Sequence, residues 1–205
     1  MADARADLRA DCSRCVGLCC VAPAFAASAD FAIDKPAGRP CPKLRPDSRC
    51  SIHSNLREQG FPGCAVFDCF GAGQHVVQVT FGGGDWRQSP ETAEAMFAVF
   101  PVMRQLKELL WYLAEALTLL SHGALRDEVQ RAQEQTKRVI GSAPDKLRQF
   151  DAAATGSRWA RCWTRSVERS ATRSKIAPPT VRAPTSLAPS SVAATFTAQA
   201  CAGPT

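Results

Sequence analysis

The chain has 205 residues, of which 45% are hydrophobic, and its 25 Lys and Arg against 19 Asp and Glu give a formal charge of +6. No uninterrupted apolar run reaches the roughly 18 residues that a membrane span requires. Residues 1–11 (MADARADLRAD) mix acids and arginines and lack the apolar core of a signal peptide. We therefore expect neither a membrane protein nor a secreted one, but a cytoplasmic chain of one or two domains.

Eight of the ten cysteines lie within residues 12–69. Disulfides are uncommon in a reducing cytoplasm, so this density predicts bound metal or an iron-sulfur cluster. Disulfides, and buried or redox-sensing thiols, are the alternatives. Eight thiolates suit two zinc ions with four sulfur ligands each, or one four-iron cluster with spare thiols. The predicted metal ligands are Cys12, Cys15, Cys19, Cys20, Cys41, Cys50, Cys64 and Cys69.

The cysteine-rich segment is predicted to be a small irregular metal-binding domain over residues 1–88. The spacing of Cys12 and Cys15 lets a turn bring two sulfurs to one ion, and Gly17 permits the tight backbone that follows. Side chains of neighbouring Cys19 and Cys20 should diverge, so that one of them packs or serves a second ion. Four prolines between residues 36 and 46 leave little room for regular structure.

Histidines add one further candidate ligand. His53 follows Cys50 by three residues in a segment that reads as a short helix, where the two side chains share a face. His75 begins HVVQVTF, whose partial alternation predicts a short strand, and His122 lies at a helix break. No histidine stands in an arrangement with an acid and a nucleophile, and neither glycine-rich stretch, FGAGQ or FGGGD, has a phosphate-loop frame. No catalytic residue is indicated.

Residues 89–153 are predicted to form a helical hairpin and a third short helix. Ser89 is a good N-cap, Pro90 suits the first helical position, and Pro101 should kink the helix that follows. Apolar residues then recur at alternating steps of three and four, the signature of a heptad seam. They are Met96, Val99, Met103, Leu106, Leu110, Leu113, Leu117 and Leu120.

Gly123 is expected to end the first helix, and a second amphipathic segment runs through Val129 and Ala132. A third helix should start after Ser142 and Pro144. Several aromatic and apolar residues lie off the seam of the first helix and widen its apolar face. They are expected to pack on the cysteine-rich domain or to form a protein-partner or homodimer surface. The residues are Phe97, Phe100, Leu109, Trp111 and Tyr112.

The last segment, residues 154–205, differs in composition from the rest. Residues 157–205 have 7 Lys and Arg against 1 Asp or Glu, whereas residues 1–156 have 18 against 18. Its richness in Ser, Thr, Ala, Pro and Arg predicts a disordered basic tail. Shifted by two nucleotides in GC-rich codons, residues 182–205 can encode RADLAGAELRGGDLHGASLRGAD, a run of five-residue units. We interpret the tail as out-of-frame sequence that begins near residue 154.

Such five-residue units are the hallmark of pentapeptide-repeat proteins, whose units stack into a right-handed quadrilateral β-helix. Residues 12–120 resemble the cysteine-rich leader of such proteins from GC-rich, actinobacterial-type genomes, through CSRCVGLCC, ADFAIDKPAGRPCPKL, RCSIHSNLREQGF, DCFGAGQ and FPVMRQLKELLWYLAEAL. The resemblance implies that the repeats themselves were lost by a frameshift.

The cysteine block also resembles the YkgJ-like family of zinc- or iron-chelating domains. Its pattern is a CxxCxxCC knot, a CPxL element, an RCxIY element and a later cysteine. In this chain the knot reads CxxCxxxCC, and His53 stands where an aromatic residue is usual. The resemblance implies ligands at Cys12, Cys15, Cys19, Cys20, Cys41, Cys50 and Cys64, with Cys69 an addition.

Together these features predict a mainly α protein with a small irregular cysteine-rich domain, a helical hairpin and a disordered C-terminal tail. We expect a non-enzymatic metal-binding adaptor that holds zinc and binds a protein partner or its own copy through the hairpin. We expect neither specific nucleic-acid binding nor membrane association. The alternative is an iron-sulfur or thiol-redox accessory protein.

Overall fold

A computed structural model of the chain describes residues 5–150, which lie within one compact unit, Met1–Ala154. The predicted tail over residues 154–205, with Cys162 and Cys201, lies outside the described residues. The predicted boundary between residues 88 and 89 stays a prediction.

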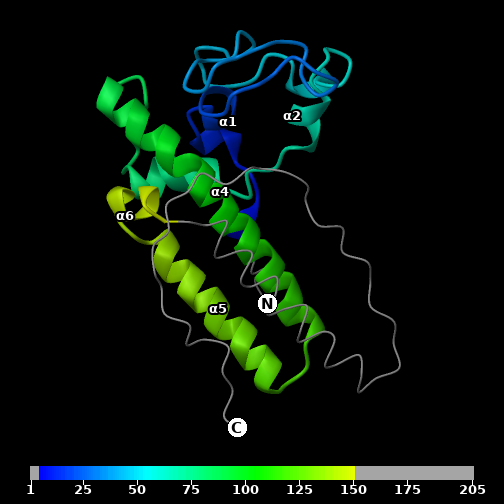
Figure 1. Cartoon of the computed structure of the whole chain (residues 1–205), viewed down its shortest axis with the longest axis vertical. Coiled ribbons are helices and arrows are strands. Elements are labelled where there is room, and N and C mark those ends of the chain that lie inside the picture. The colour runs from blue at the N-terminus through cyan, green and yellow to red at the C-terminus, as the bar shows by residue number, and fades with distance from the viewer. Residues whose placement is uncertain (1–4, 151–205) are drawn as a thin grey trace. The chain divides into compact units, whose positions relative to one another are not determined.

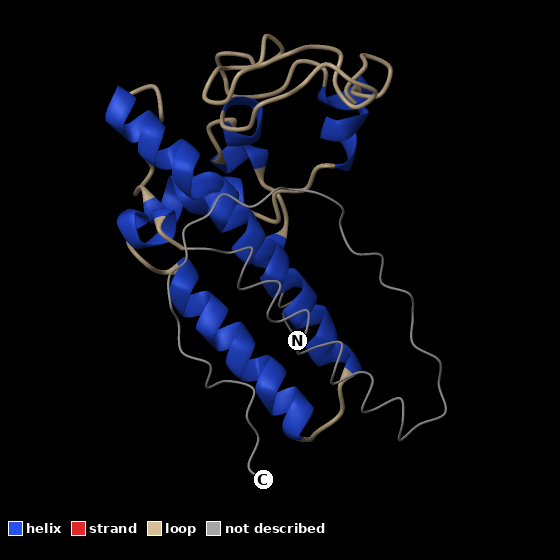
Figure 2. Ribbon diagram, viewed as in Figure 1, coloured by secondary structure: helices blue, strands red, loops and turns tan. Residues whose placement is uncertain are grey.

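The described residues are mainly helical, as predicted, and contain no β-strand (Figure 2). Two isolated bridges, Phe25 with Lys35 and Leu44 with Cys50, are the extent of β pairing between residues 5 and 150. Loops make up most of the cysteine-rich part. The helices are η1 (Ala6–Leu8), η2 (Cys12–Arg14), α1 (Leu18–Val21), η3 (His53–Asn55), α2 (Pro62–Val66), α3 (Ala72–His75), η4 (Val76–Thr80), α4 (Pro90–Leu119), α5 (Ala124–Ile140) and α6 (Pro144–Arg148).

The long helix α4 starts where the sequence predicted. The Ser89 hydroxyl accepts a hydrogen bond from the Thr92 backbone N–H at 3.1 Å, and Pro90 occupies the first turn, where no N–H is needed. The helix continues through Pro101 to Leu119, and the kink expected at Pro101 stays a prediction. Pro101 is exposed, and its ring therefore does not disturb the buried face.

Helices α4 and α5 form the predicted hairpin and lie side by side, running in opposite directions (Figure 1). The first helix ends earlier than predicted, at Leu119, and Gly123 instead caps the start of α5 with a φ of 143°. The Arg126 guanidinium donates to the Leu120 carbonyl at 2.8 Å, which closes the end of α4 from the second helix. The third helix, α6, follows Ala143 as expected.

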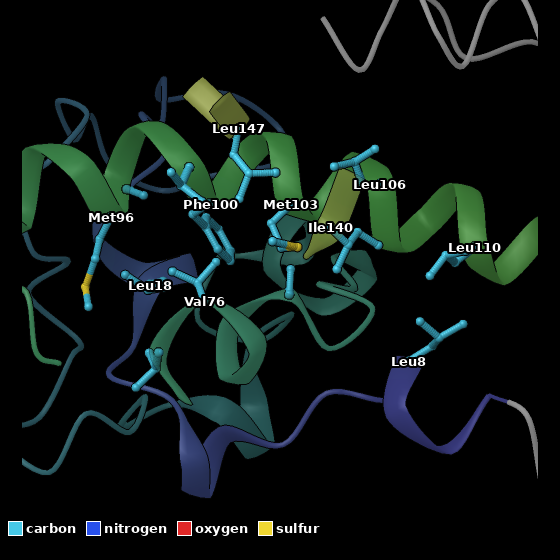
Figure 3. Packing of buried hydrophobic residues seen from close by; sticks show 14 residues of the cluster. Leu8, Leu18, Val76, Met96, Phe100, Met103, Leu106, Leu110, Ile140 and Leu147 are labelled. Carbon is cyan, nitrogen blue, oxygen red and sulfur yellow. The ribbon is translucent and has the colours of Figure 1, made fainter. Parts of the chain in front are cut away.

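The buried core is organised along one face of α4, and most of the predicted seam lies in it. Helices η1, α1, α3, η4 and α6, the end of α5 and the residue after α1 contribute the other side chains (Figure 3). The residues of this core with at most 1% exposure include Leu18, Ala72, Val76, Met96, Val99, Met103, Leu106 and Leu147.

Two of the off-seam aromatic residues pack on the cysteine-rich part of the chain. Ring centroids of Phe97 and Trp86 are 5.8 Å apart, and those of Trp111 and Phe70 are 5.9 Å apart. Tyr112 instead remains 60% exposed. The wide apolar face of α4 therefore covers the cysteine-rich loops and leaves a small surface free. Within residues 5–150, none of the helices is both long and apolar enough to cross a membrane.

The strand predicted at residues 75–81 is wrong, because this segment is helical. Gly71 adopts φ 77° at the start of α3, and the chain continues through a π-helical turn, η4. Val76 and Val77 are both at most 2% exposed, whereas a strand with one buried face would expose one of two neighbours. Val76 follows the buried Ala72 by four residues, which is a helical spacing.

Truncation of Leu147 should test how far α6 belongs to the core. Leu147 is fully buried against α4, so we expect Leu147→Ala to lower the free energy of unfolding by about 2–5 kcal/mol. Leu119→Ala is the matched control, since Leu119 is 74% exposed, and should change stability by less than about 0.5 kcal/mol. Urea titration followed by circular dichroism measures both. Equal stabilities of the two variants would show that α6 does not pack as described.

Candidate metal centre

The eight predicted ligands, which we call the thiol cluster, are all free cysteines in the structure. Cys41 is buried, Cys12 is exposed, and the other six are partly buried. Thiols that are free and partly shielded remain available for ligation.

The first cysteines of the chain are held against α3. The Gln78 side-chain amide donates to the Arg14 carbonyl at 3.0 Å, which ties η2 to the π-helical turn. A Cβ atom placed on Gly73 would lie 2.7 Å from the Cys15 sulfur, so α3 forms a cradle for this thiol that only glycine leaves open. Cys69 begins the turn into α3, because its carbonyl accepts from the Ala72 N–H at 2.8 Å. Two segments of the thiol cluster therefore meet at this helix, that of Cys15 and that of Cys69.

The adjacent cysteines of the knot, Cys19 and Cys20, have sulfurs that lie close together, contrary to the prediction that these side chains diverge. Gly17 adopts the left-handed conformation, with φ 73°, and its carbonyl accepts from the Cys20 N–H at 2.9 Å. The Cys19 and Cys20 sulfurs are 4.0 Å apart. Cys20 in turn accepts a backbone hydrogen bond from Cys41 at 2.9 Å, which joins the knot to the proline-rich loop.

The later cysteines are placed by turns and by a short helix. Leu44 and Cys50 form an isolated bridge, so Cys50 lies across from the turn that follows Cys41. Cys64 lies in α2, and the neighbouring Gly63 N–H donates to the Asp30 carbonyl at 3.1 Å. These contacts fold the loop back toward the knot.

A buried lysine organises the loop between Cys20 and Cys41. Lys35 is 3% exposed, and its ammonium donates to the carbonyls of Val21 at 3.0 Å, Pro36 at 3.1 Å and Arg39 at 2.9 Å. It also lies 4.8 Å from the centroid of the Phe25 ring. Sequence reasoning missed this residue, because nothing local distinguishes it from a surface lysine.

Burial raises the pKa values of several of the thiols. It raises the pKa of Cys15 to about 11 and that of Cys64 to about 11. The hydrogen bond with Cys20, together with burial, raises the pKa of Cys19 well above its usual range. These thiols are therefore protonated at neutral pH in the absence of metal, and a metal ion must displace their protons to bind.

Charge interactions show which thiols are neighbours. Negative charge on Cys19 or Cys69 would add to the effect of burial in raising the pKa of both Cys12 and Cys15. Negative charge on Cys19, Cys41 or Cys50 would likewise raise the pKa of Cys64. These charge effects and the Cys19–Cys20 contact link the eight thiols into one neighbourhood, in which a charge on Cys19 acts on thiols at both ends.

Among residues 5–150 there is nevertheless no group of three or more His, Cys, Asp or Glu side chains arranged to hold a metal ion. The thiols are neighbours without converging on one point. His53 begins a short helix, η3, as expected, but Cys50 lies outside it in a bridge with Leu44, so the prediction that the two side chains share a helix face is wrong. His53 is exposed and lines a cavity of about 380 Å³ together with Cys64. His122 is exposed, and His75 ends α3 and lines a different cavity, which none of the cysteines of the thiol cluster lines.

The chain is similar to a protein of Bacillus subtilis (strain 168) that carries the description "uncharacterized protein YybG". The two are 52% identical over 141 residues, which cover 69% of this chain and 50% of the relative. The chain thus spans about half the length of the relative it matches. No protein-family model and no solved structure matches the chain.

Replacement of the buried lysine should unfold the proline-rich loop. Lys35→Met keeps the length of the side chain but leaves its carbonyl partners without a donor, so we expect a loss of about 3 kcal/mol in the free energy of unfolding. The control Lys43→Met removes the same charge from a partly exposed position of the same loop, and should cost less than about 0.5 kcal/mol. Chemical denaturation of both variants gives the values. A loss no larger for Lys35→Met than for its control would contradict the role assigned to Lys35.

Proposed function

We propose that the chain is a non-enzymatic metal-binding adaptor, in which the thiol cluster holds zinc and the helical hairpin offers a surface to a protein partner or to a second copy. One observation carries this proposal. Eight free thiols from separate segments of a loop-rich region lie in one connected neighbourhood around Cys19. A region with so little regular structure gains most from a bound ion, which supplies folding free energy directly.

We assign the eight thiols to two sets of four, as two tetrahedral zinc ions require. The first set is Cys12, Cys15, Cys19 and Cys69, in which charges on Cys19 and Cys69 act on the pKa of Cys12 and Cys15. The second set is Cys20, Cys41, Cys50 and Cys64, in which charges on Cys41 and Cys50 act on the pKa of Cys64 and the Cys41 N–H donates to the Cys20 carbonyl. In each set the sulfurs must move together to bind an ion, because no group of three among residues 5–150 is already arranged around one point. The contact between the Cys19 and Cys20 sulfurs joins the two sets, and His53 is a reserve ligand beside Cys64. Bound zinc would supply a fixed crosslink between chain segments and no redox chemistry.

The second candidate function is an iron-sulfur or thiol-redox accessory protein. It is favoured by the neighbouring sulfurs of Cys19 and Cys20, because a four-iron cluster needs only four thiolates and would leave such a pair to exchange electrons. The two candidates differ in colour, since zinc gives a colourless protein and a cluster absorbs visible light.

Metal analysis of anaerobically purified full-length protein tests the main proposal. We expect about two zinc ions per chain, released together with chelator-induced loss of structure. Cys41→Ser should remove about one of them, because the buried Cys41 thiol belongs to one set of four. Zinc affinity should rise with pH, since the raised pKa values of Cys15 and Cys64 leave protons for the metal to displace.

The double substitution of Cys162 and Cys201 by serine is the matched control, since both lie outside the thiol cluster, and it should leave the zinc content unchanged. Visible absorbance that bleaches on reduction would replace the main proposal by the second candidate. A metal-free protein that is well folded would overturn both.

We propose that the partner surface is the exposed part of the helical hairpin. Tyr112 is 60% exposed and Leu119 is 74% exposed, both on α4. Large apolar side chains on a helix that already covers the core on its other face are typical of protein-binding surfaces. The balanced charge of residues 1–156, 18 Lys and Arg against 18 Asp and Glu, favours a protein partner over nucleic acid or membrane. A cytoplasmic location follows from the same proposal, because it keeps the thiols reduced.

We also propose that the C-terminal segment is out-of-frame sequence in place of pentapeptide repeats. The change in composition supports this proposal, since residues 157–205 have 7 Lys and Arg against 1 Asp or Glu, whereas residues 1–156 have 18 against 18. Determination of the coding DNA decides the point. The frame shifted by two nucleotides should encode regular five-residue units with a central Leu over residues 182–205, and a shifted frame without them would contradict the proposal.

A further inference from the structure

A second cavity lies apart from the thiol sulfurs, and its volume is about 620 Å³. It is bounded by the segment around η1 and η2, by α3 and η4, and by α4 and α5. This volume is within the range of about 300–1,000 Å³ that small-molecule sites occupy. None of the predicted metal ligands lines it.

One wall of this cavity carries a buried lysine without a partner. Lys107 is 5% exposed, and within residues 5–150 it has neither a hydrogen bond nor an ion pair. Burial lowers its pKa, and the charges of Asp7 and Cys69 act in the opposite direction. The side chain is buried along its length, but its ammonium is not sealed from the cavity, so an anion in the cavity can accept its hydrogen bonds. Lys107 differs in this respect from Lys35, whose donors are all engaged by carbonyls.

A histidine on the same cavity offers a second unsatisfied group. The Nε2 atom of His75 is buried and has no hydrogen-bond partner in the described part of the chain. Burial and the charge of Lys107 lower the pKa of His75 to about 4, so its ring is neutral at physiological pH. A neutral ring can donate through an Nε2–H group. The neighbouring ammonium disfavours a metal cation at this nitrogen and favours an anion.

The charges of the residues that line the cavity also favour an anion. Its lining residues include four cations, Arg9, Arg14, Lys107 and Lys137, against the two acids Asp7 and Asp11. The Asp11 carboxylate is already engaged, because it accepts a hydrogen bond from the Ser13 N–H at 3.0 Å. The excess of two positive charges matches a phosphate monoester, which carries about −1.5 to −2 at neutral pH.

We propose that this cavity binds a small phosphorylated molecule, with the phosphate group held by the Lys107 ammonium and the His75 Nε2–H. The phosphate supplies the acceptors that both groups lack, and the remaining volume accommodates the rest of the ligand. None of the proposed zinc ligands lines this cavity, so phosphate binding can be tested whether or not zinc is bound.

The test uses the full chain and inorganic phosphate as the probe, with acetate and chloride at equal ionic strength as reference anions. Phosphate should raise the melting temperature, and calorimetric titration should give saturable binding that acetate does not reproduce. Lys107→Met should weaken phosphate binding by about 10- to 100-fold, because an interaction with a charged group is lost. Lys146→Met removes the same charge from an exposed position of α6, and should bind phosphate as the unaltered chain does.

Folding of the lysine variant is not a concern under the proposal, since replacement of a buried, unpaired charge by an apolar side chain is neutral or stabilising. An NMR titration of the unaltered chain gives an independent readout. Phosphate should shift the His75 side-chain nitrogens and leave those of the exposed His53 and His122 in place. Equal phosphate affinity in the Lys107→Met and Lys146→Met variants, an equal response to acetate, or an unmoved His75 signal would each overturn the proposal.

Discussion

The buried face of α4 is the constraint on which the described part of this protein depends. Helix α5 packs against its second half, while α3, η4 and α6 pack against its first half. The cysteine-rich loops reach it through aromatic pairs such as Trp86 with Phe97. These loops have little core of their own, so the helix supplies the hydrophobic burial that a chain of short turns cannot provide for itself. Helix α4 therefore helps to hold the thiols in place, although no cysteine lies in that helix.

Local sequence features were enough to predict the three helices α4, α5 and α6. The Ser89 cap, the period of the apolar residues from Met96 to Leu113 and the proline at the start of α6 each act within a few residues, so that their effect can be read directly. The error at residues 75–81 arose because β-branched residues favour strands locally. Packing of Val76 and Val77 against α4 outweighs that preference. The cysteine positions were readable, but their grouping depends on contacts between segments up to 57 residues apart, from Cys12 to Cys69.

Two lysines show why composition alone could not identify the important polar residues. Lys35 and Lys107 are both almost fully buried, at 3% and 5% exposure. The first is satisfied by backbone carbonyls, and the second has no such partners in the described residues. Lys107 lies four residues after Met103 and three before Leu110, both buried, so its place on the apolar face of α4 was visible in the sequence. Lys35 had no such signal, because its environment is created by the fold of an irregular loop.

Gly73 affects the position of a cysteine outside its own helix. The Cys15 sulfur rests where a side chain at position 73 would have to lie, so the position of this thiol is determined in part by a residue with no donor atom. Two related chains could therefore keep every cysteine and still differ in whether Cys15 reaches its neighbours. Alignments that compare the cysteines alone would count such chains as equivalent, whereas the identity of one small residue separates them.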